Sequence, residues 1–252
     1  MTAPAPGAVA AVAFDLDGTL VDLERFHHDA WLAAARQAGV TLTREQAQHR
    51  LPHLIGGPDP LVAAEIAALS PSGAPAAGIL AAKHPAFDEL VGRVPEIVPR
   101  AGVRTVLEGL RDRGVPLAVG TATGRDTALT VLRRAGLLEL FGEARVVAAQ
   151  DVPRLKPAPD VYLATARLLG VPAGRQLVFE DSATGAAAAR AAGSPVVAVP
   201  TVHDPDYLRR FDELGALAVA GEWAEPDLTS LLDRLLGGDT RSATVRAAYV
   251  RA

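Results

Sequence analysis

Side chains able to bind a metal or a phosphate follow short apolar segments at widely separated places in this 252-residue chain. The apolar run of residues 9–16 ends in Asp15-Leu16-Asp17-Gly18-Thr19. Three later apolar runs, 115–120, 145–149 and 176–179, precede these polar residues: Thr121 and Thr123; Arg154 and Lys156; Glu180, Asp181 and Ser182. Converging carboxylates repel each other unless a cation neutralises them, and their oxygens suit Mg²⁺. Hydroxyls, an ammonium and free backbone N–H groups suit a phosphate. The residue types predict a combined Mg²⁺ and phosphate site.

A simpler structural role has to be weighed for each of these residues. An Asp or Ser that follows a strand often caps the next helix, and Asp181-Ser182 precedes an Ala-rich helical segment. Capping does not explain an Asp-x-Asp-Gly spacing directly after a buried strand. The recurrence of polar residues after all four apolar runs favours a functional site.

The polar residues can meet only if the apolar runs are strands of one parallel sheet, because ligands bind beyond the carboxyl ends of such strands. The runs lack alternation, as expected for strands buried on both faces. Further runs at 195–200 and 216–220 extend the set. Helical patterns separate the runs, at 104–113, 126–135, 158–169 and 182–192. This rhythm predicts an α/β fold with a doubly wound parallel sheet, a Rossmann-like core.

Residues 22–98 interrupt that rhythm with helical patterns alone, at 24–38, 43–51, 60–69 and about 79–91. We therefore predict an α-helical cap domain inserted after the first strand. The core is expected to comprise residues 1–21 and 99–236. Residues 237–252 begin with Gly-Gly and have weak periodicity, which predicts a flexible C-terminal tail.

Composition excludes several classes of protein. Net charge is −4, which argues against binding nucleic acid through its phosphates. The chain lacks cysteine, a signal peptide pattern and any stretch of about 20 apolar residues, so we expect a soluble cytoplasmic protein without membrane contact. Of the 25 basic residues only two are lysines, Lys83 and Lys156, and both call for an explanation because Lys and Arg differ physically.

The polar segments resemble the four motifs of the haloacid dehalogenase superfamily of hydrolases, in order. The segment from Asp15 to Leu20 resembles the first motif and Thr121 the second. Lys156-Pro157 resembles the third motif, and Glu180-Asp181-Ser182 the fourth. The likeness covers nearly the whole chain. The helical insertion is similar to the small cap of the superfamily's phosphoglucomutase-like branch.

The resemblance implies roles for these residues. Asp15 would be the nucleophile that forms an aspartyl-phosphate, and Asp17 the general acid and base. Thr121, Ala122 and Lys156 would bind the phosphate. Mg²⁺ would be held by the side chains of Asp15 and Asp181 and by the backbone carbonyl of Asp17. Glu180 would either bind the metal directly or support the residues that bind it. A dehalogenase proper needs no metal, so the Glu180-Asp181 pair argues against that chemistry.

The cap resembles beta-phosphoglucomutase at three positions, His27, Trp31 and Lys83, which would contact the substrate. The alternatives are an exposed helix position for His27 and a place in the cap core for Trp31. Where that mutase has a cap-loop arginine for the distal phosphate, this chain has residues 55–59, which end in Asp59. Arg25, Arg50 or Arg93 could substitute.

The sequence thus predicts an Mg²⁺-dependent phosphomonoester hydrolase acting on a small sugar or sugar-like phosphate, as a monomer or homodimer. A phosphosugar mutase using the same aspartyl-phosphate is the first alternative. A non-catalytic protein that binds a phosphate or a partner is a further alternative.

Overall fold

The chain divides into two compact units in a computed structural model that describes residues 8–55 and 57–237. One unit comprises Met1–Asp22 together with Ile97–Ala252, and the other is Leu23–Glu96. The predicted tail lies outside the described residues from residue 238 onward, as do residues 1–7.

The first unit is built on one sheet, which in the described residues has six parallel strands in the order β3-β2-β1-β4-β5-β6. The strands are β1 (Ala11–Phe14), β2 (Leu117–Gly120), β3 (Val146–Val147), β4 (Gln176–Glu180), β5 (Val196–Ala198) and β6 (Ala218–Val219). The order reverses direction at β1, whose neighbours are β2 and β4. Crossovers on both sides of β1 make the sheet doubly wound, as predicted.

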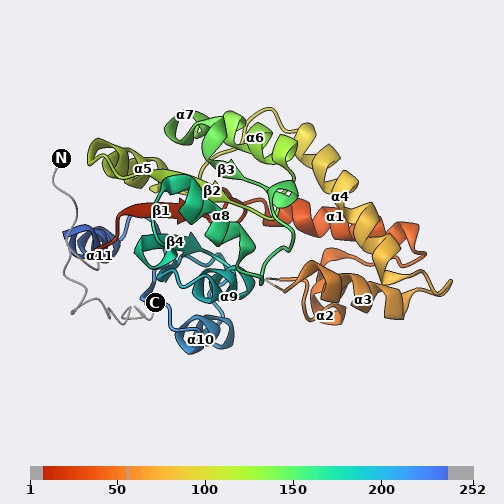
Figure 1. The fold of residues 1–252 in the computed structure, drawn as a ribbon. Coiled ribbons are helices and arrows are strands. Elements are labelled where there is room, and N and C mark those ends of the chain that lie inside the picture. Colours follow the sequence, from red (N-terminus) through yellow and green to blue (C-terminus); the bar gives the residue numbers. More distant parts are fainter. Residues whose placement is uncertain (1–7, 56, 238–252) are drawn as a thin grey trace. The chain divides into compact units, whose positions relative to one another are not determined.

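Helices connect the strands and cover both faces of the sheet (Figure 1). They are α5 (Val103–Asp112), α6 (Arg125–Arg134), α7 (Leu138–Phe141), α8 (Asp160–Leu169), α9 (Ala183–Ala191), α10 (Pro205–Glu213) and α11 (Pro226–Gly237). Single 3₁₀ turns occur at Glu143–Arg145, Ala149–Asp151 and Ala173–Arg175. Within this unit, α5 to α7 lie on one side of the sheet and α9 and α10 on the other.

Strand alternation separates the two hydrophobic layers of this unit. Ala13 and Val178 pair in register and pack on the α8–α10 side. Their neighbours Phe14 and Phe179 point the other way and stack, with ring centroids 5.3 Å apart. Trp223 packs on Phe179 at 4.8 Å and closes that layer. All of these side chains are fully or nearly fully buried, so they fix the strand register that positions the polar residues beyond.

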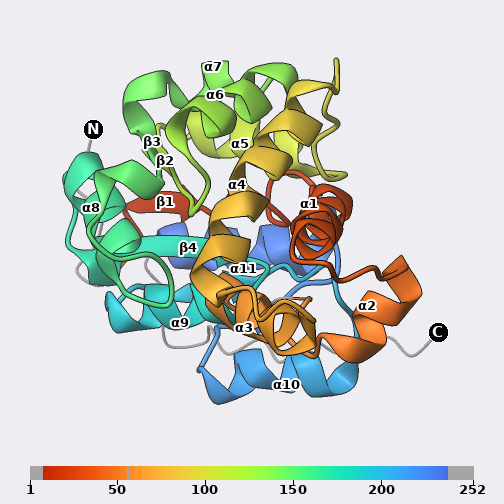
Figure 2. The ribbon, with the colours of Figure 1, turned by 90° about the vertical axis from the view of Figure 1, so that its right-hand side faces the viewer.

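The second unit consists of the helices α1 (Glu24–Gln37), α2 (Arg44–Arg50), α3 (Asp59–Leu69) and α4 (Ala76–Gly92). Helix α4 packs against α1 and α3 (Figure 2). A buried cluster that includes Trp31, Leu51 and Ile66 forms its core. Thr43 and Gln46 form a capping box that starts α2.

The predicted fold class is confirmed, and all six predicted strands are present. Five of them are shorter than the predicted runs, whereas β4 extends one residue further, to Glu180. Helices α7, α10 and α11 were not predicted. The sequence does contain a start signal for α10, namely the pair Asp204-Pro205. Asp204 caps the helix by accepting hydrogen bonds from the backbone N–H groups of Asp206 and Tyr207, and Pro205 is the first helical residue. Within the described residues, every helix is too short or too polar to cross a membrane.

Candidate active site

The carboxyl ends of β1, β2 and β4 bring the predicted residues to one edge of the sheet. Asp15 follows β1 directly, and its backbone N–H donates to the carbonyl of Phe179 in β4 at 3.0 Å. Thr121 follows β2, and its N–H donates to Val147 of β3 at 3.0 Å. Glu180 is the last residue of β4. Three strands that are neighbours in space therefore supply one site. In sequence, β1 and β2 are separated by more than 100 residues, and β2 and β4 by more than 50.

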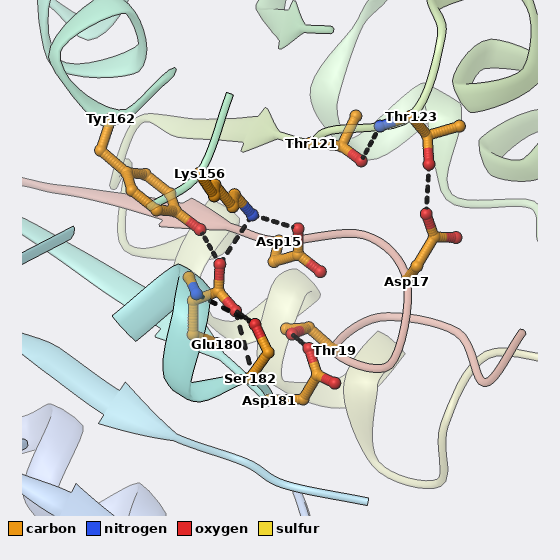
Figure 3. Close-up of polar contacts among 11 residues, drawn as sticks. Asp15, Asp17, Thr19, Thr121, Thr123, Lys156, Tyr162, Glu180, Asp181 and Ser182 are labelled. Carbon is orange, nitrogen blue, oxygen red and sulfur yellow. Dashed lines mark hydrogen bonds and ion pairs between the residues drawn. The ribbon is translucent and has the colours of Figure 1, made fainter. Parts of the chain in front are cut away.

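Lys156 lies between two of the carboxylates (Figure 3). Its Nζ atom donates to Asp15 Oδ1 and, at 2.6 Å, to Glu180 Oε1. The Lys156 side chain is 8% exposed and that of Glu180 is fully buried. The hydroxyl of Tyr162 in α8 donates to the same Glu180 oxygen. The contacts fix Lys156 against Asp15, which is where a cation can assist a nucleophilic carboxylate.

Asp181 is held by the segment that follows β1. The hydroxyl of Thr19 donates to Asp181 Oδ1 at 3.0 Å. Gly18 has a φ of 85°, and a Cβ atom at this position would lie 2.1 Å from Asp181 Oδ2. Only glycine permits both this backbone conformation and so close an approach. The Gly18 in the first motif thus brings Asp181 close to the chain segment that carries Asp15.

Asp17 points away from these carboxylates toward the turn after β2 (Figure 3). The Thr123 hydroxyl donates to Asp17 Oδ2, and the Thr123 N–H donates to Thr121 Oγ1 at 3.0 Å. The turn therefore couples Asp17 to Thr121. Asp17 is half-buried, so its carboxyl group is less enclosed than that of Asp15. Ala122 is the exposed residue of the turn.

Burial and charge shift the acidity of this cluster. Burial, together with the charges of Glu180 and Asp17, raises the pKa of Asp15 to about 8 although the charge of Lys156 opposes the shift. Burial and the charges of Asp15 and Glu180 likewise hold the pKa of Asp181 well above its usual range. For Lys156, burial alone would lower the pKa, but the two carboxylates outweigh it and raise the pKa. Repulsion among buried carboxylates is the condition that a bound cation relieves.

The donor set fits a hard divalent cation. Asp15, Glu180 and Asp181 each offer a carboxylate oxygen, and these oxygens lie within 4.8 Å of one another. An all-oxygen set of this kind suits Mg²⁺. The cluster contains the two motif carboxylates predicted for the metal together with Glu180. The Asp17 side chain is not part of it, which is compatible with a role for its backbone carbonyl.

Several residues that shape the site had no sequence signal. The guanidinium of Arg100 donates to the carbonyl of Gly18 at 2.6 Å and to that of Val199 beyond β5. The indole N–H of Trp223 donates to the Thr19 carbonyl at 3.1 Å. These contacts anchor the segment after β1 to distant parts of the same unit. Their spacing in sequence is too long for any local pattern to reveal them.

The capping role predicted for Asp181-Ser182 is filled by Ser182. Its hydroxyl caps α9 by accepting from the N–H of Gly185 at 3.0 Å, and it also donates to Glu180 Oε2 at 3.1 Å. Asp181 does not cap this helix, since its Oδ1 accepts from Thr19 instead. The capping reading is thus correct for Ser182, while the carboxylates belong to the cluster.

The three cap residues gather within the second unit. The ring of His27 stacks on Phe87 with centroids 4.1 Å apart. Lys83 Nζ lies 5.4 Å from the centroids of both Trp31 and Phe87. Trp31 is also part of the buried cap core, with 2% exposure. Burial, followed by the charge of Lys83, lowers the pKa of His27 to about 3.

In a comparison with family models, the model of haloacid dehalogenase-like hydrolases matches residues 9–193. The chain belongs to the haloacid dehalogenase-like hydrolases. The matched range includes all four motifs.

Individual members of the family are similar to this hydrolase over most of its length. Protein CbbY of Rhodobacter capsulatus is 34% identical over 87% of this chain and 94% of its own. Fructose-1-phosphate phosphatase YqaB of Escherichia coli is 33% identical over 75% of this chain and 96% of its own. A crystal structure of a CbbY variant from Rhodobacter sphaeroides with xylulose-1,5-bisphosphate has a TM-score of 0.68 and 28% identity, covering 86% of this hydrolase and 96% of that chain. The predicted superfamily is confirmed, and the named phosphatases agree with the predicted enzyme class.

Proposed function

We propose that this protein is an Mg²⁺-dependent phosphatase that hydrolyses the phosphomonoester of a small sugar or sugar-like compound through an aspartyl-phosphate on Asp15. One observation carries the proposal: the buried Asp15 carboxylate is in contact with Lys156 and lies beside Glu180 and Asp181. A nucleophile, a fixed cation and a set of metal ligands thus share one place. A fructose-1-phosphate phosphatase among the relatives supports the substrate class.

In the first step an Asp15 oxygen attacks phosphorus, and the bond from phosphorus to the leaving oxygen breaks. Asp17 gives its proton to that oxygen, so the product leaves as an alcohol. Lys156 offsets the negative charge on Asp15 and on the phosphoryl oxygens. The hydroxyl of Thr121 and the backbone N–H of Ala122 bind the phosphoryl group at the end of β2.

In the second step water attacks phosphorus and releases inorganic phosphate, which restores the Asp15 carboxylate. Asp17 takes the proton of this water and is ready for the next cycle. The hydrogen bond from Thr123 orients Asp17 for both transfers. Bound Mg²⁺, held by Asp15, Asp181, the Asp17 carbonyl and Glu180, would offset the charge of the carboxylates and of the phosphate.

We further propose that His27, Trp31 and Lys83 of the cap contact the leaving group. Their clustering in the second unit supports this, because Lys83 offers a charged donor between two aromatic faces. Aromatic faces and a few fixed polar groups are typical of sugar sites.

The test is the release of inorganic phosphate from a panel of sugar monophosphates, with Mg²⁺ and with a chelator. We expect release that depends on Mg²⁺ and that Asp15→Asn abolishes, because the neutral amide cannot attack phosphorus. Asp233→Asn is the matched control, since Asp233 is an exposed carboxylate paired with Arg113. Isomerisation stimulated by a sugar bisphosphate, with little phosphate release, would identify a mutase and contradict the proposal.

A further inference from the structure

A partly buried ion pair joins two helices of the cap. Lys83 in α4 is 5% exposed at its side chain, and its Nζ atom lies 2.9 Å from Oδ2 of Asp59, the first residue of α3. The Asp59 side chain is 40% exposed. The lysine is therefore enclosed, whereas its carboxylate partner reaches solvent.

The Lys83–Asp59 pair carries no net charge. Burial alone would raise the pKa of Asp59, but the contacts with His84 and Lys83 and the charge of Lys83 outweigh it and hold the pKa below its usual range. Asp59 is thus ionised at neutral pH and balances the charge of Lys83. The lowered pKa of His27 keeps that ring neutral beside them. An enclosed ammonium needs such a partner, since an unpaired buried charge is costly.

We propose that Asp59 restricts the substrate to monophosphates with an uncharged, hydroxylated leaving group, by occupying Lys83 and repelling a second phosphate. This inference rests on the proposed function and on the proposed contact between the cap residues and the leaving group. Sugar hydroxyls can donate to the exposed Asp59 oxygens. A second phosphate would instead be repelled by the carboxylate of Asp59, which already neutralises the charge of Lys83.

Besides Lys83, the imidazole of His84 approaches this carboxylate, with Nε2 3.8 Å from Asp59 Oδ2, whereas two arginines of the cap pair elsewhere. Arg93, the residue after α4, is exposed and pairs with Glu89, four residues earlier in that helix. Arg44 pairs with both oxygens of Asp29 at 2.7 Å. Each of these pairs is exposed and lies on other residues, so Lys83 is the ammonium that Asp59 controls.

The test compares kcat/KM for the best monophosphate of the panel with that for the bisphosphate of the same sugar, for example fructose 1-phosphate and fructose 1,6-bisphosphate. We expect the unchanged protein to prefer the monophosphate. Asp59→Asn keeps the shape, frees the lysine charge and should lower this preference about tenfold, mainly through the KM of the bisphosphate. Adding Lys83→Met to Asp59→Asn should abolish the gain, because no ammonium is left to bind the second phosphate.

The matched control is Glu89→Gln, which removes one negative charge from α4 at an exposed pair and should leave the preference unchanged. Melting temperatures of all variants check folding. If the unchanged protein hydrolyses the monophosphate and Asp59→Asn has the same preference, the inference is wrong while the proposed function stands. A preference of the unchanged protein for the bisphosphate also overturns it. Failure to hydrolyse either compound, or any other phosphate ester, overturns both.

Discussion

At the scale of single residues, the two acids of the first motif differ in what surrounds them. Asp15 is enclosed with Lys156 and the other carboxylates. Asp17 is half-buried and bonded to a neutral hydroxyl, that of Thr123. A carboxylate in contact with an ammonium suits nucleophilic attack, whereas one outside the cluster can exchange a proton with the leaving oxygen. The difference in surroundings agrees with the proposed division of roles.

Asp17→Asn should lower kcat for a sugar phosphate by roughly 10²- to 10⁴-fold, because the amide cannot protonate the leaving oxygen. The loss should be much smaller for an activated aryl phosphate, whose leaving group needs no proton. Turnover of both substrates measures this. Thr123→Val, which removes only the hydrogen bond to Asp17, is the control and should have a milder effect. Equal losses for both substrates would refute the acid role.

Lys156→Arg tests whether charge alone suffices. The Lys156 ammonium is enclosed between Asp15 and Glu180, with the Tyr162 ring 5.0 Å away. A guanidinium is larger, planar and prefers a bidentate partner, so it should displace one of the two carboxylates. We expect roughly a 10²-fold loss of kcat with Mg²⁺ present. Activity close to that of the unchanged protein would mean that position and size do not matter here.

At the scale of elements, α9 begins against the site. A Cβ atom on Gly185, in the first turn of α9, would lie 1.8 Å from Glu180 Oε1. This residue therefore lets the helix start next to a buried carboxylate that is bonded to Lys156 and Tyr162. The close approach is a tertiary requirement, since helix propensity alone disfavours glycine.

Gly185→Ala should destabilise the protein and lower activity, although alanine is the better helix former. Thermal unfolding and phosphate release measure both effects. The control is Gly109→Ala in α5, where a Cβ atom would meet nothing within 4 Å. That change should raise stability by about 0.5–1 kcal/mol and leave activity unchanged. A gain in stability at both positions would show that the space beside Glu180 is not required.

At the scale of the whole molecule, the carboxylate cluster would link the proposed metal binding to stability. Burial raises the pKa of Asp15 from 3.8 to about 8, although the charge of Lys156 opposes this shift. The pKa of Asp181 is also raised. A group with a raised pKa in the folded state contributes stability below its unfolded pKa and loses it as pH rises through the folded value. Without a metal, the ionisation of Asp15 should therefore make the stability of the protein fall as the pH rises from about 4 to about 8, and that of Asp181 should act in the same direction.

Mg²⁺ should raise the melting temperature more at pH 8 than at pH 6, because it binds the ionised carboxylates and competes with protons. At a concentration a hundredfold above Kd, the gain is about 2.7 kcal/mol. Unfolding measured at constant ionic strength, with and without a chelator, tests this. Asp181→Asn should remove most of the Mg²⁺ effect. An equal effect at both pH values, or one that survives in this variant, would contradict a metal site at these residues.

The sequence by itself predicted the α/β class, the positions of the strands and the identity of the residues at their ends. It could do so because buried parallel strands read as apolar runs, and because polar residues after such runs have few structural roles. It predicted the motif residues Asp15, Lys156, Glu180 and Asp181, which the structure brings together. Helix α7 has only four residues, too few for a periodic pattern. Helices α10 and α11 were not predicted although the sequence carries signals for both, namely Asp204-Pro205 at the start of α10 and the helical spacing of Leu228, Leu231, Leu232 and Leu235 in α11.

Only the tertiary structure decided which of these groups touch. Strand register and close packing join Lys156 to Asp15 across 141 positions and Thr19 to Asp181 across 162. The same holds for Tyr162 of α8 against Glu180 of β4, and for Lys83 of α4 against Asp59 of α3. Local pattern depends on the backbone period of one element, whereas these contacts depend on how elements pack, and packing is a property of the folded chain alone.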